Sequence, residues 1–129
     1  MSRTYHLLPT AIHHLREHKV WSLDRFGRAT TKKYFQDMDK GFQFIADNHQ
    51  RFPSRSKLTG SSGLYLYSVR EHYVVYVPTD HDIYIIAIVG QVQDVPNLLR
   101  TNAAIFHRDV AAYIASLKKR SGNKPKKTS

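Results

Sequence analysis

Histidines near the N-terminus have the residue type and spacing that metal chemistry uses. His14 and His18 lie one turn apart on a predicted helix, a spacing that can bind zinc, and His13 lies beside them. A third ligand at a matching position and the HExxH pattern of zinc enzymes are missing from the sequence. We therefore expect all three histidines to face solvent, and we predict neither a metal site nor a cofactor.

A second polar group, Asp80–Asp82, has side chains suited to acid–base or metal chemistry. It lies between two apolar runs, where Asp and His usually hydrogen-bond the backbone of a tight turn. The sequence has no glycine-rich phosphate loop and no GxSxG or Ser/His/Asp pattern worth assigning. The residues alone therefore predict no catalytic side chain.

The elements that must position any site are organised around residues 64–99. Apolar runs at Leu64–Val69, Tyr73–Val77 and Ile83–Gly90 predict three strands. They are separated by short polar breaks at Arg70–His72 and Pro78–Asp82, which are typical of turns. The pattern predicts an antiparallel β-meander.

The third run, Ile83–Val89, is apolar at odd and even positions alike. A strand of this kind belongs in the middle of a sheet that is covered on both faces. Helices before residue 60 can supply one cover. The other can come from a C-terminal helix, a second copy of the chain or a different protein. We favour the C-terminal helix, because a cover from the same chain costs less entropy.

The N-terminal part predicts a strand at Thr4–Leu8 and then a helix from Ala11 to Phe26, capped by Thr10. Gly27 marks the expected end of this helix. Its predicted buried stripe consists of Ala11, Ile12, Leu15, Leu23 and Phe26.

A second helix is predicted from Thr30 to His49, with Gly41 allowing close packing, and residues 51–63 are expected to form a loop. Its predicted buried stripe consists of Tyr34, Phe35, Met38, Phe42 and Ile45. The short connection predicts an antiparallel helix hairpin that lies on one face of the sheet.

The C-terminal part predicts one amphipathic helix. It begins at Asp94–Asn97, has Pro96 in its first turn, and ends near Arg120, with Gly122 terminating it. The fold class is therefore α+β, with residues 1–120 as a single domain and 121–129 as a disordered basic tail.

The composition limits the classes of function. The 129 residues contain no cysteine, and they carry 20 Lys and Arg against 10 acidic residues, a formal charge of +10. This balance favours a polyanionic partner such as nucleic acid, an acidic protein or a membrane surface. We expect no signal peptide, no membrane span and a cytoplasmic location.

Two aromatic residues, Trp21 and Phe44, project away from the buried stripes of their helices. Trp is enriched at binding hot spots, so both are candidate anchors for a partner protein. The alternative is that each packs against a neighbouring element of the same chain.

The order of these elements resembles the RelE/ParE toxin superfamily, and ParE more closely than RelE. The resemblance rests on YHLLPTAIHHL (Tyr5–Leu15), DRFGRATTKKYFQDMDKGFQFIADN (Asp24–Asn48) and REHYVVYVPTDHDIYIIAIVGQVQDVPNLL (Arg70–Leu99). It covers roughly residues 4–99. It implies a toxin of a plasmid or chromosomal type II toxin–antitoxin pair, an antitoxin partner with which it can form an oligomer, and inhibition of DNA gyrase.

RelE-type relatives cut messenger RNA with Arg, Lys, Tyr or His residues on the meander and near its end, among them an Arg before the VVY run and a basic pair after the last strand. Here the corresponding positions hold Tyr73, Val92 and Asp94, so the cations that stabilise a phosphorane are missing. We therefore expect a non-enzymatic toxin. The alternatives are a ribosome-dependent endoribonuclease that uses Tyr73, and a nucleic-acid-binding module that uses the last helix and tail.

The hypothesis assigns two sets of binding residues. Trp21 and Phe44 are the predicted antitoxin-binding residues. The strand-exit residues Gln91, Gln93 and Asp94 are the predicted target-binding residues.

Overall fold

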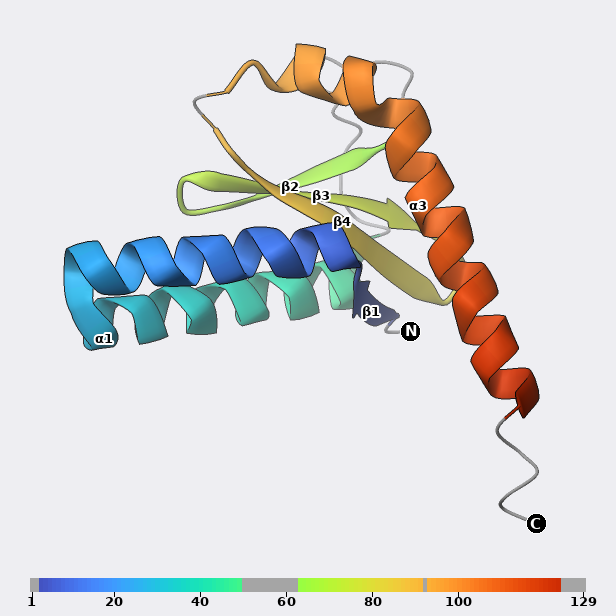
Figure 1. Ribbon diagram of the computed structural model, residues 1–129, viewed down its shortest axis with the longest axis horizontal. Helices are drawn as coiled ribbons and strands as arrows, with labels where there is room; N and C mark the ends of the chain where they lie inside the picture. Colours follow the sequence, from blue (N-terminus) through green and yellow to red (C-terminus); the bar gives the residue numbers. More distant parts are fainter. Residues whose placement is uncertain (1–2, 50–62, 92, 124–129) are drawn as a thin grey trace.

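The computed structural model describes residues 3–49, 63–91 and 93–123, with the backbone alone for 120–123. The elements are β1 (Thr4–Leu7), α1 (Pro9–Asn48), β2 (Tyr65–Val69), β3 (His72–Pro78), β4 (Asp82–Gly90) and α3 (Val95–Asn123) (Figure 1). The predicted α+β class and the order of elements are confirmed. The predicted loop at 51–63, apart from Gly63, and the tail from residue 124 lie outside the described residues.

The four strands form one sheet in the order β1-β4-β3-β2. The pairs β2–β3 and β3–β4 are antiparallel, as the meander predicted, whereas β1 pairs with β4 in parallel. Val69 pairs with His72, so the first turn has only two central residues and His72 belongs to β3. The predicted three-residue break was therefore one residue too long, because Arg70 adopts a positive φ of 53° and closes the tighter turn.

Strand β4 lies in the interior of the sheet, as its apolar sequence predicted. Its pairing with β3 steps from Val75↔Ala87 to Tyr76↔Ile85, so Ile86 is an extra residue in a β-bulge. The bulge shifts the alternation of side chains along β4 by one residue. Tyr84 and Ile86 face one side of the sheet, and Ala87, directly after the extra residue, faces that same side. Both faces of β4 are buried.

Helix α1 is a hairpin of two helical segments (Figure 1). They meet at Gly27, whose φ of 83° and ψ of −176° are accessible to glycine and strained for other residues. At the bend the buried Thr31 hydroxyl donates to the Gly27 carbonyl over 2.8 Å, and it shares a 2.7 Å hydrogen bond with the hydroxyl of buried Ser22. The predicted helix end at Gly27 and the antiparallel hairpin are confirmed.

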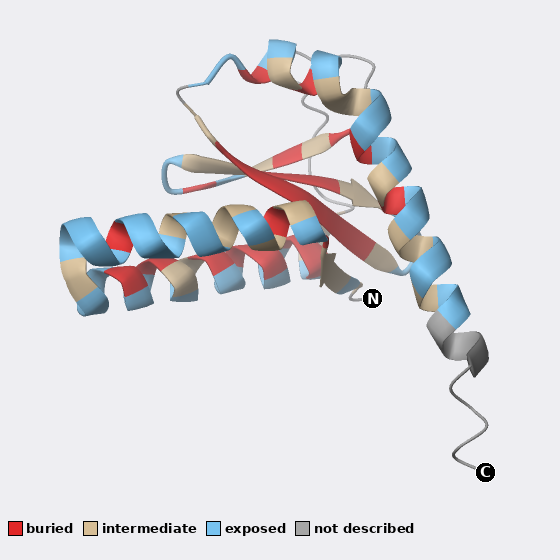
Figure 2. Cartoon of the chain, in the orientation of Figure 1, coloured by how far each residue is buried: buried red, intermediate tan, exposed pale blue. Residues whose placement is uncertain are grey.

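Two predictions for the first segment of α1 were wrong. The helix begins at Pro9 after Leu8, and Thr10 does not cap it, because proline at a first helical position already has the required φ. Leu23 and Phe26 are exposed although they were assigned to the buried stripe. The bend of the hairpin projects beyond the sheet, so nothing in the described chain covers these side chains (Figures 1 and 2).

The second segment of α1 packs on one face of the sheet with the predicted stripe, in which Phe35 is only partly buried. Ala11 and Ala46 join this cluster, while Tyr76, Ile83 and Ile85 contribute from the sheet. The buried members are Ala11, Tyr34, Met38, Phe42, Ile45, Ala46, Val69, Val74, Tyr76, Ile83, Ile85 and Ile88.

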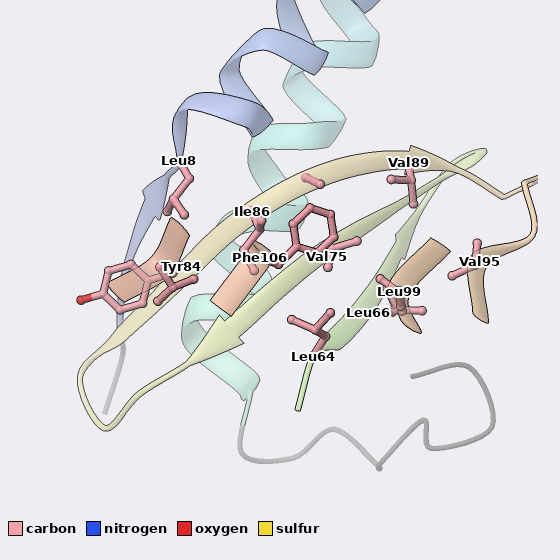
Figure 3. Close-up of a cluster of buried hydrophobic side chains, with 12 residues drawn as sticks. Leu8, Leu64, Leu66, Val75, Tyr84, Ile86, Val89, Val95, Leu99 and Phe106 are labelled. Carbon is pink, nitrogen blue, oxygen red and sulfur yellow. The ribbon is translucent and has the colours of Figure 1, made fainter. Parts of the chain in front are cut away.

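Helix α3 covers the opposite face, as the favoured alternative predicted (Figure 3). Leu99 and Phe106 pack against Tyr84 and Ile86 in a cluster that includes Leu8. The helix continues through Gly122 to Asn123, so the predicted stop at Gly122 was wrong. The reason is that a glycine weakens a helix by about 1 kcal/mol without forbidding it.

A substitution at Gly41 tests how closely α1 packs on the sheet. A Cβ atom at this position would lie 2.6 Å from Val69 Cγ2. We expect Gly41→Ala to lower the free energy of unfolding by about 1–3 kcal/mol in urea titrations. In the double variant with Val69→Ala the clash is gone, so the loss should be smaller than the sum of the two single losses. A Gly41→Ala variant that is as stable as the wild type would contradict this packing.

Candidate functional site

Trp21 lies near the bend of the α1 hairpin with its side chain 47% exposed. Its ring makes an edge contact with Phe26 at 5.5 Å between centroids, and the Arg25 guanidinium lies 5.2 Å from the Trp21 ring centroid. Val20 and Leu23, close to Trp21 in the sequence, are also exposed. This tip gathers an exposed Trp, an exposed Phe and an Arg, the composition of a protein-binding hot spot.

Phe44 lies on the other segment of α1, where it borders a shallow groove against the sheet. Its side chain is 46% exposed, and its ring lies 5.7 Å from that of Tyr67. The groove has a volume of about 250 Å³, and its lining is Asp37, Lys40, Gly41, Phe44, Tyr67, Ser68 and Val69. Phe44 thus packs partly against its own sheet and still presents apolar surface to solvent.

Gln91 follows β4 and is fixed against the neighbouring strands. Its side-chain amide donates to Ser68 Oγ and, over 3.1 Å, to the His72 carbonyl. Its backbone N–H donates to the Glu71 carbonyl over 3.0 Å. The residue therefore holds the end of β4 against the β2–β3 turn.

The next two predicted target-binding residues differ in their surroundings. Asp94 precedes α3, and its Oδ1 accepts a hydrogen bond from the Asn97 N–H over 3.3 Å, which caps the helix. Gln93 is exposed. Pro96 lies in the first turn of α3, as predicted.

The structure brings some of these residues together. Ser68 lines the Phe44 groove and also binds Gln91, so these two predicted sites are adjacent. Trp21 is connected to the strand exit through His18, whose ring lies 5.4 Å from Trp21 and 4.7 Å from His72. Gln91, Gln93 and Asp94 follow the end of β4, where β2 turns into β3, and Trp21 and Phe44 lie on the two segments of α1.

Sequence reasoning missed a cluster of His18, Tyr34 and His72 at this end of the sheet. The Tyr34 hydroxyl and His72 Nδ1 share a 3.2 Å hydrogen bond, and the rings of His18 and Tyr34 lie 4.3 Å apart. Arg70 adds a cation above the Tyr34 ring and donates through Nε to Asp37 over 2.8 Å.

The expectation that all three N-terminal histidines face solvent was wrong for His14 and His18, which are partly buried. His13 is exposed, as predicted, whereas His14 Nδ1 accepts the Ile88 N–H of β4 over 3.2 Å. The spacing of His14 and His18 from buried Ala11 puts them on the face that packs on the sheet, and this spacing was the available signal.

Burial sets the protonation of the cluster. It lowers the pKa of His18, and it lowers the pKa of His72, where the nearby His18 acts in the same direction and Glu71 opposes it. Burial also raises the pKa of Tyr34. The cluster is therefore neutral near pH 7, which suits a packed structural contact.

The Asp80–Asp82 segment forms a turn in which the Thr79 N–H donates to the Asp82 carbonyl over 2.8 Å. The Asp82 carboxylate pairs instead with His6 Nε2 at 2.8 Å. In residues 3–49, 63–91 and 93–123, no three His, Cys, Asp or Glu side chains gather closely enough to hold a metal ion. Neither described helix has an apolar stretch of the length that a membrane crossing requires.

These features define a small α+β domain with a helix hairpin on a four-stranded sheet, and solved structures share this fold. One, titled "Chromosomal ParDE TA system from P. aeruginosa", matches with a TM-score of 0.60 at 12% identity. The match covers 69% of this chain and 96% of that chain, and at this identity it shows the fold alone. A search of the curated protein sequences finds no significant match.

The family is identified by the sequence itself. The model described as "ParE toxin of type II toxin-antitoxin system, parDE" matches residues 5–95. The chain belongs to this family of ParE toxins, and membership implies an antitoxin partner. The matched region ends where α3 begins, so α3 is an addition to the part of the chain that the family model describes.

The lowered pKa values predict how stability depends on pH. Burial lowers the pKa of a histidine in the folded chain relative to the unfolded chain, where it is about 6.5. Such a histidine makes its full contribution to the free energy of unfolding above pH 6.5, and this contribution is lost as the pH falls through the folded pKa. We expect the melting temperature of the wild type to be lower at pH 5 than at pH 7. The difference should be smaller in His72→Gln.

The matched control is His81→Gln, which changes an exposed histidine in the β3–β4 turn. It should keep the pH dependence of the wild type. A melting temperature that stays constant or rises on acidification, or equal behaviour of the two variants, would show that the cluster does not couple folding to protonation.

Proposed function

We propose that this chain inhibits DNA gyrase by binding it, without catalysing a reaction, and that its cognate antitoxin neutralises it. The observation that carries the proposal is the family match over residues 5–95. The proposal places the protein in the cytoplasm, where gyrase is found, and gives it a role in plasmid stabilisation.

Two positions support a mechanism without catalysis. Tyr73, where RelE-type enzymes have a basic residue, is partly buried and packs against the cluster beneath α3. Asp94, at a position that is basic in those enzymes, caps α3 and carries a negative charge that would repel a phosphate. Neither side chain offers a cation to a scissile phosphodiester.

Trp21 and Phe44 are the proposed antitoxin anchors. Both are nearly half exposed on one hairpin, and a partner that crosses the hairpin could bury both aromatic rings. The formal charge of +10 favours an acidic partner of this kind.

The antitoxin assignment is tested with the protein encoded beside this gene. We expect Trp21→Ala and Phe44→Ala each to weaken its binding, measured by isothermal titration calorimetry, by about 2 kcal/mol, or roughly thirtyfold in Kd. Ile105→Ala removes a similarly exposed apolar side chain from α3 and should leave the Kd unchanged. Equal affinities for all four proteins would remove Trp21 and Phe44 from the interface.

The gyrase assignment is tested with purified enzyme in a DNA supercoiling assay. We expect inhibition by micromolar wild-type chain and a roughly tenfold weaker effect from Gln93→Ala combined with Asp94→Ser, or about 1.4 kcal/mol. Serine retains the helix cap while removing the charge. The control, Asp80→Ser, lies in the β3–β4 turn at the opposite end of the sheet and should inhibit normally.

Other results would assign a different function to this chain. Absence of inhibition and of trapped cleavage complexes at micromolar wild-type chain would exclude gyrase. Messenger RNA cleavage on ribosomes that is lost in Tyr73→Phe would instead identify a ribonuclease. Salt-dependent binding to nucleic acid that is lost on removal of residues 118–129 would identify a nucleic-acid-binding module.

A further inference from the structure

The bend of the α1 hairpin gathers most of the exposed apolar surface of the described chain. The bend projects beyond the sheet, so it stands clear of the rest of the fold (Figures 1 and 2). Among the described residues six large hydrophobic side chains are exposed, and four of them lie in the last two turns before the bend: Val20, Trp21, Leu23 and Phe26. We call these four residues and the bend at Gly27 the hairpin tip.

The apolar side chains surround the hairpin tip. Trp21 and Leu23 are two residues apart, which places them on opposite sides of a helix. The Trp21 ring lies 5.4 Å from that of His18, while Leu23 lines a groove of about 940 Å³ between the two segments of α1. A helix that is apolar on all sides requires apolar surroundings on all sides. A partner that lies along one side of the hairpin would leave the other side in water.

Cations accompany these apolar side chains. Residues 18–36 contain a single acidic residue, Asp24, and five exposed basic residues, which are Lys19, Arg25, Arg28, Lys32 and Lys33. The Arg25 guanidinium lies 5.2 Å from the centroid of the Trp21 ring and 6.0 Å from that of Phe26. Long basic side chains can follow an apolar surface while their charged ends stay in a polar layer. Trp, Phe and aliphatic residues together with Lys and Arg are typical of segments that bind the surface of an anionic bilayer.

Hydrogen bonds inside the bend satisfy polar groups that the break in the helix would otherwise expose. The Thr31 hydroxyl donates to the Gly27 carbonyl and shares a hydrogen bond with the Ser22 hydroxyl, and both hydroxyl-bearing residues are buried. An unsatisfied polar group is costly at an apolar boundary. These three groups therefore need no water when the hairpin tip enters such a boundary.

We propose that the hairpin tip binds the surface of an anionic phospholipid membrane. Its four apolar side chains enter the boundary between headgroups and acyl chains, and its five cations pair with anionic headgroups. The phosphate backbone of a nucleic acid would match the cations but has no apolar layer for Val20 and Leu23. The inference goes beyond the proposed function, because it depends on neither gyrase nor the antitoxin.

Trp21 is the only tryptophan of the chain, so tryptophan fluorescence reports on the hairpin tip alone. The full chain is titrated with phosphatidylcholine vesicles, either pure or with about one third phosphatidylglycerol. We expect the emission to move to shorter wavelength, and lipids brominated on their acyl chains to quench it, with the anionic vesicles only. The shift should diminish as salt is added, because salt screens the attraction to the headgroups.

Co-sedimentation with the anionic vesicles measures the affinity of variants. Phe26→Ser should weaken binding about tenfold or more, the effect of one apolar side chain that is no longer buried. The matched control is Ile105→Ser on α3, where the side chain is 45% exposed against 54% for Phe26. The control should bind within about twofold of the wild type. Circular dichroism melts verify that each variant folds.

Changes of charge test which part of the chain faces the lipid. Asp24→Asn removes the acidic residue of this region and should strengthen binding about fivefold, and Arg28→Gln should weaken it by a similar factor. Arg108→Gln removes an exposed charge from α3 and should bind within about twofold of the wild type.

Several results would overturn the proposal. One is that the anionic vesicles do not bind the chain, and another is that they bind it while the Trp21 emission stays unchanged, which indicates adsorption by charge alone. Equal losses in Phe26→Ser and Ile105→Ser would also contradict it. Loss of gyrase inhibition in Phe26→Ser without any vesicle binding would assign the hairpin tip to a protein target. Quenching of Trp21 by oligothymidylate but no response to vesicles would assign it to nucleic acid.

Discussion

The burial of β4 on both faces is the constraint on which the rest of this structure depends. Ile83, Ile85 and Ile86 are fully buried, and burying one such side chain contributes about 1.5–3 kcal/mol. A strand of this composition requires a cover on each side of the sheet. The α1 hairpin supplies one cover, and α3 supplies the other from the same chain.

This arrangement determines which surfaces are available to partners. With both sheet faces occupied, the exposed apolar side chains lie mostly where the hairpin projects beyond the sheet. Gln91 holds the end of β4 against the β2–β3 turn, and Asp94 starts α3, so the strand exit is held in a fixed position. The hairpin and the strand exit are the two surfaces at which we propose that the partners bind. Helix α3 lies beyond the family match and covers the second face of the sheet.

The sequence predicted the features that hydrophobic periodicity encodes. The central place of Ile83–Val89, the hairpin bend at Gly27 and the cover by α3 each follow from spacing of apolar residues or from a glycine. Periodicity does not encode how far a sheet reaches beneath a helix, so Leu23 and Phe26 were wrongly assigned to the core. The same limit applies to contacts between distant segments, such as those of His18 with His72 and of β1 with β4.

The candidate site was predictable only in part. The exposed aromatic character of Trp21 and Phe44 followed from their position opposite the buried stripes, and the structure finds both nearly half exposed. The hydrogen bonds of Gln91 and the capping role of Asp94 depend on where β2, β3 and α3 meet, which spacing along one element does not reveal. The groove beside Leu23 likewise requires the packing of two helices at Gly27.

Native-state hydrogen exchange on the full chain tests most directly whether both covers of β4 come from this chain and remain in place. We expect the amides of Ile83–Val89 to exchange only through global unfolding, with a free energy equal to that from denaturant titration. Exchange of the β4 and α3 amides together at a clearly lower free energy would contradict it, because α3 would then separate from the sheet and leave that face open to a partner.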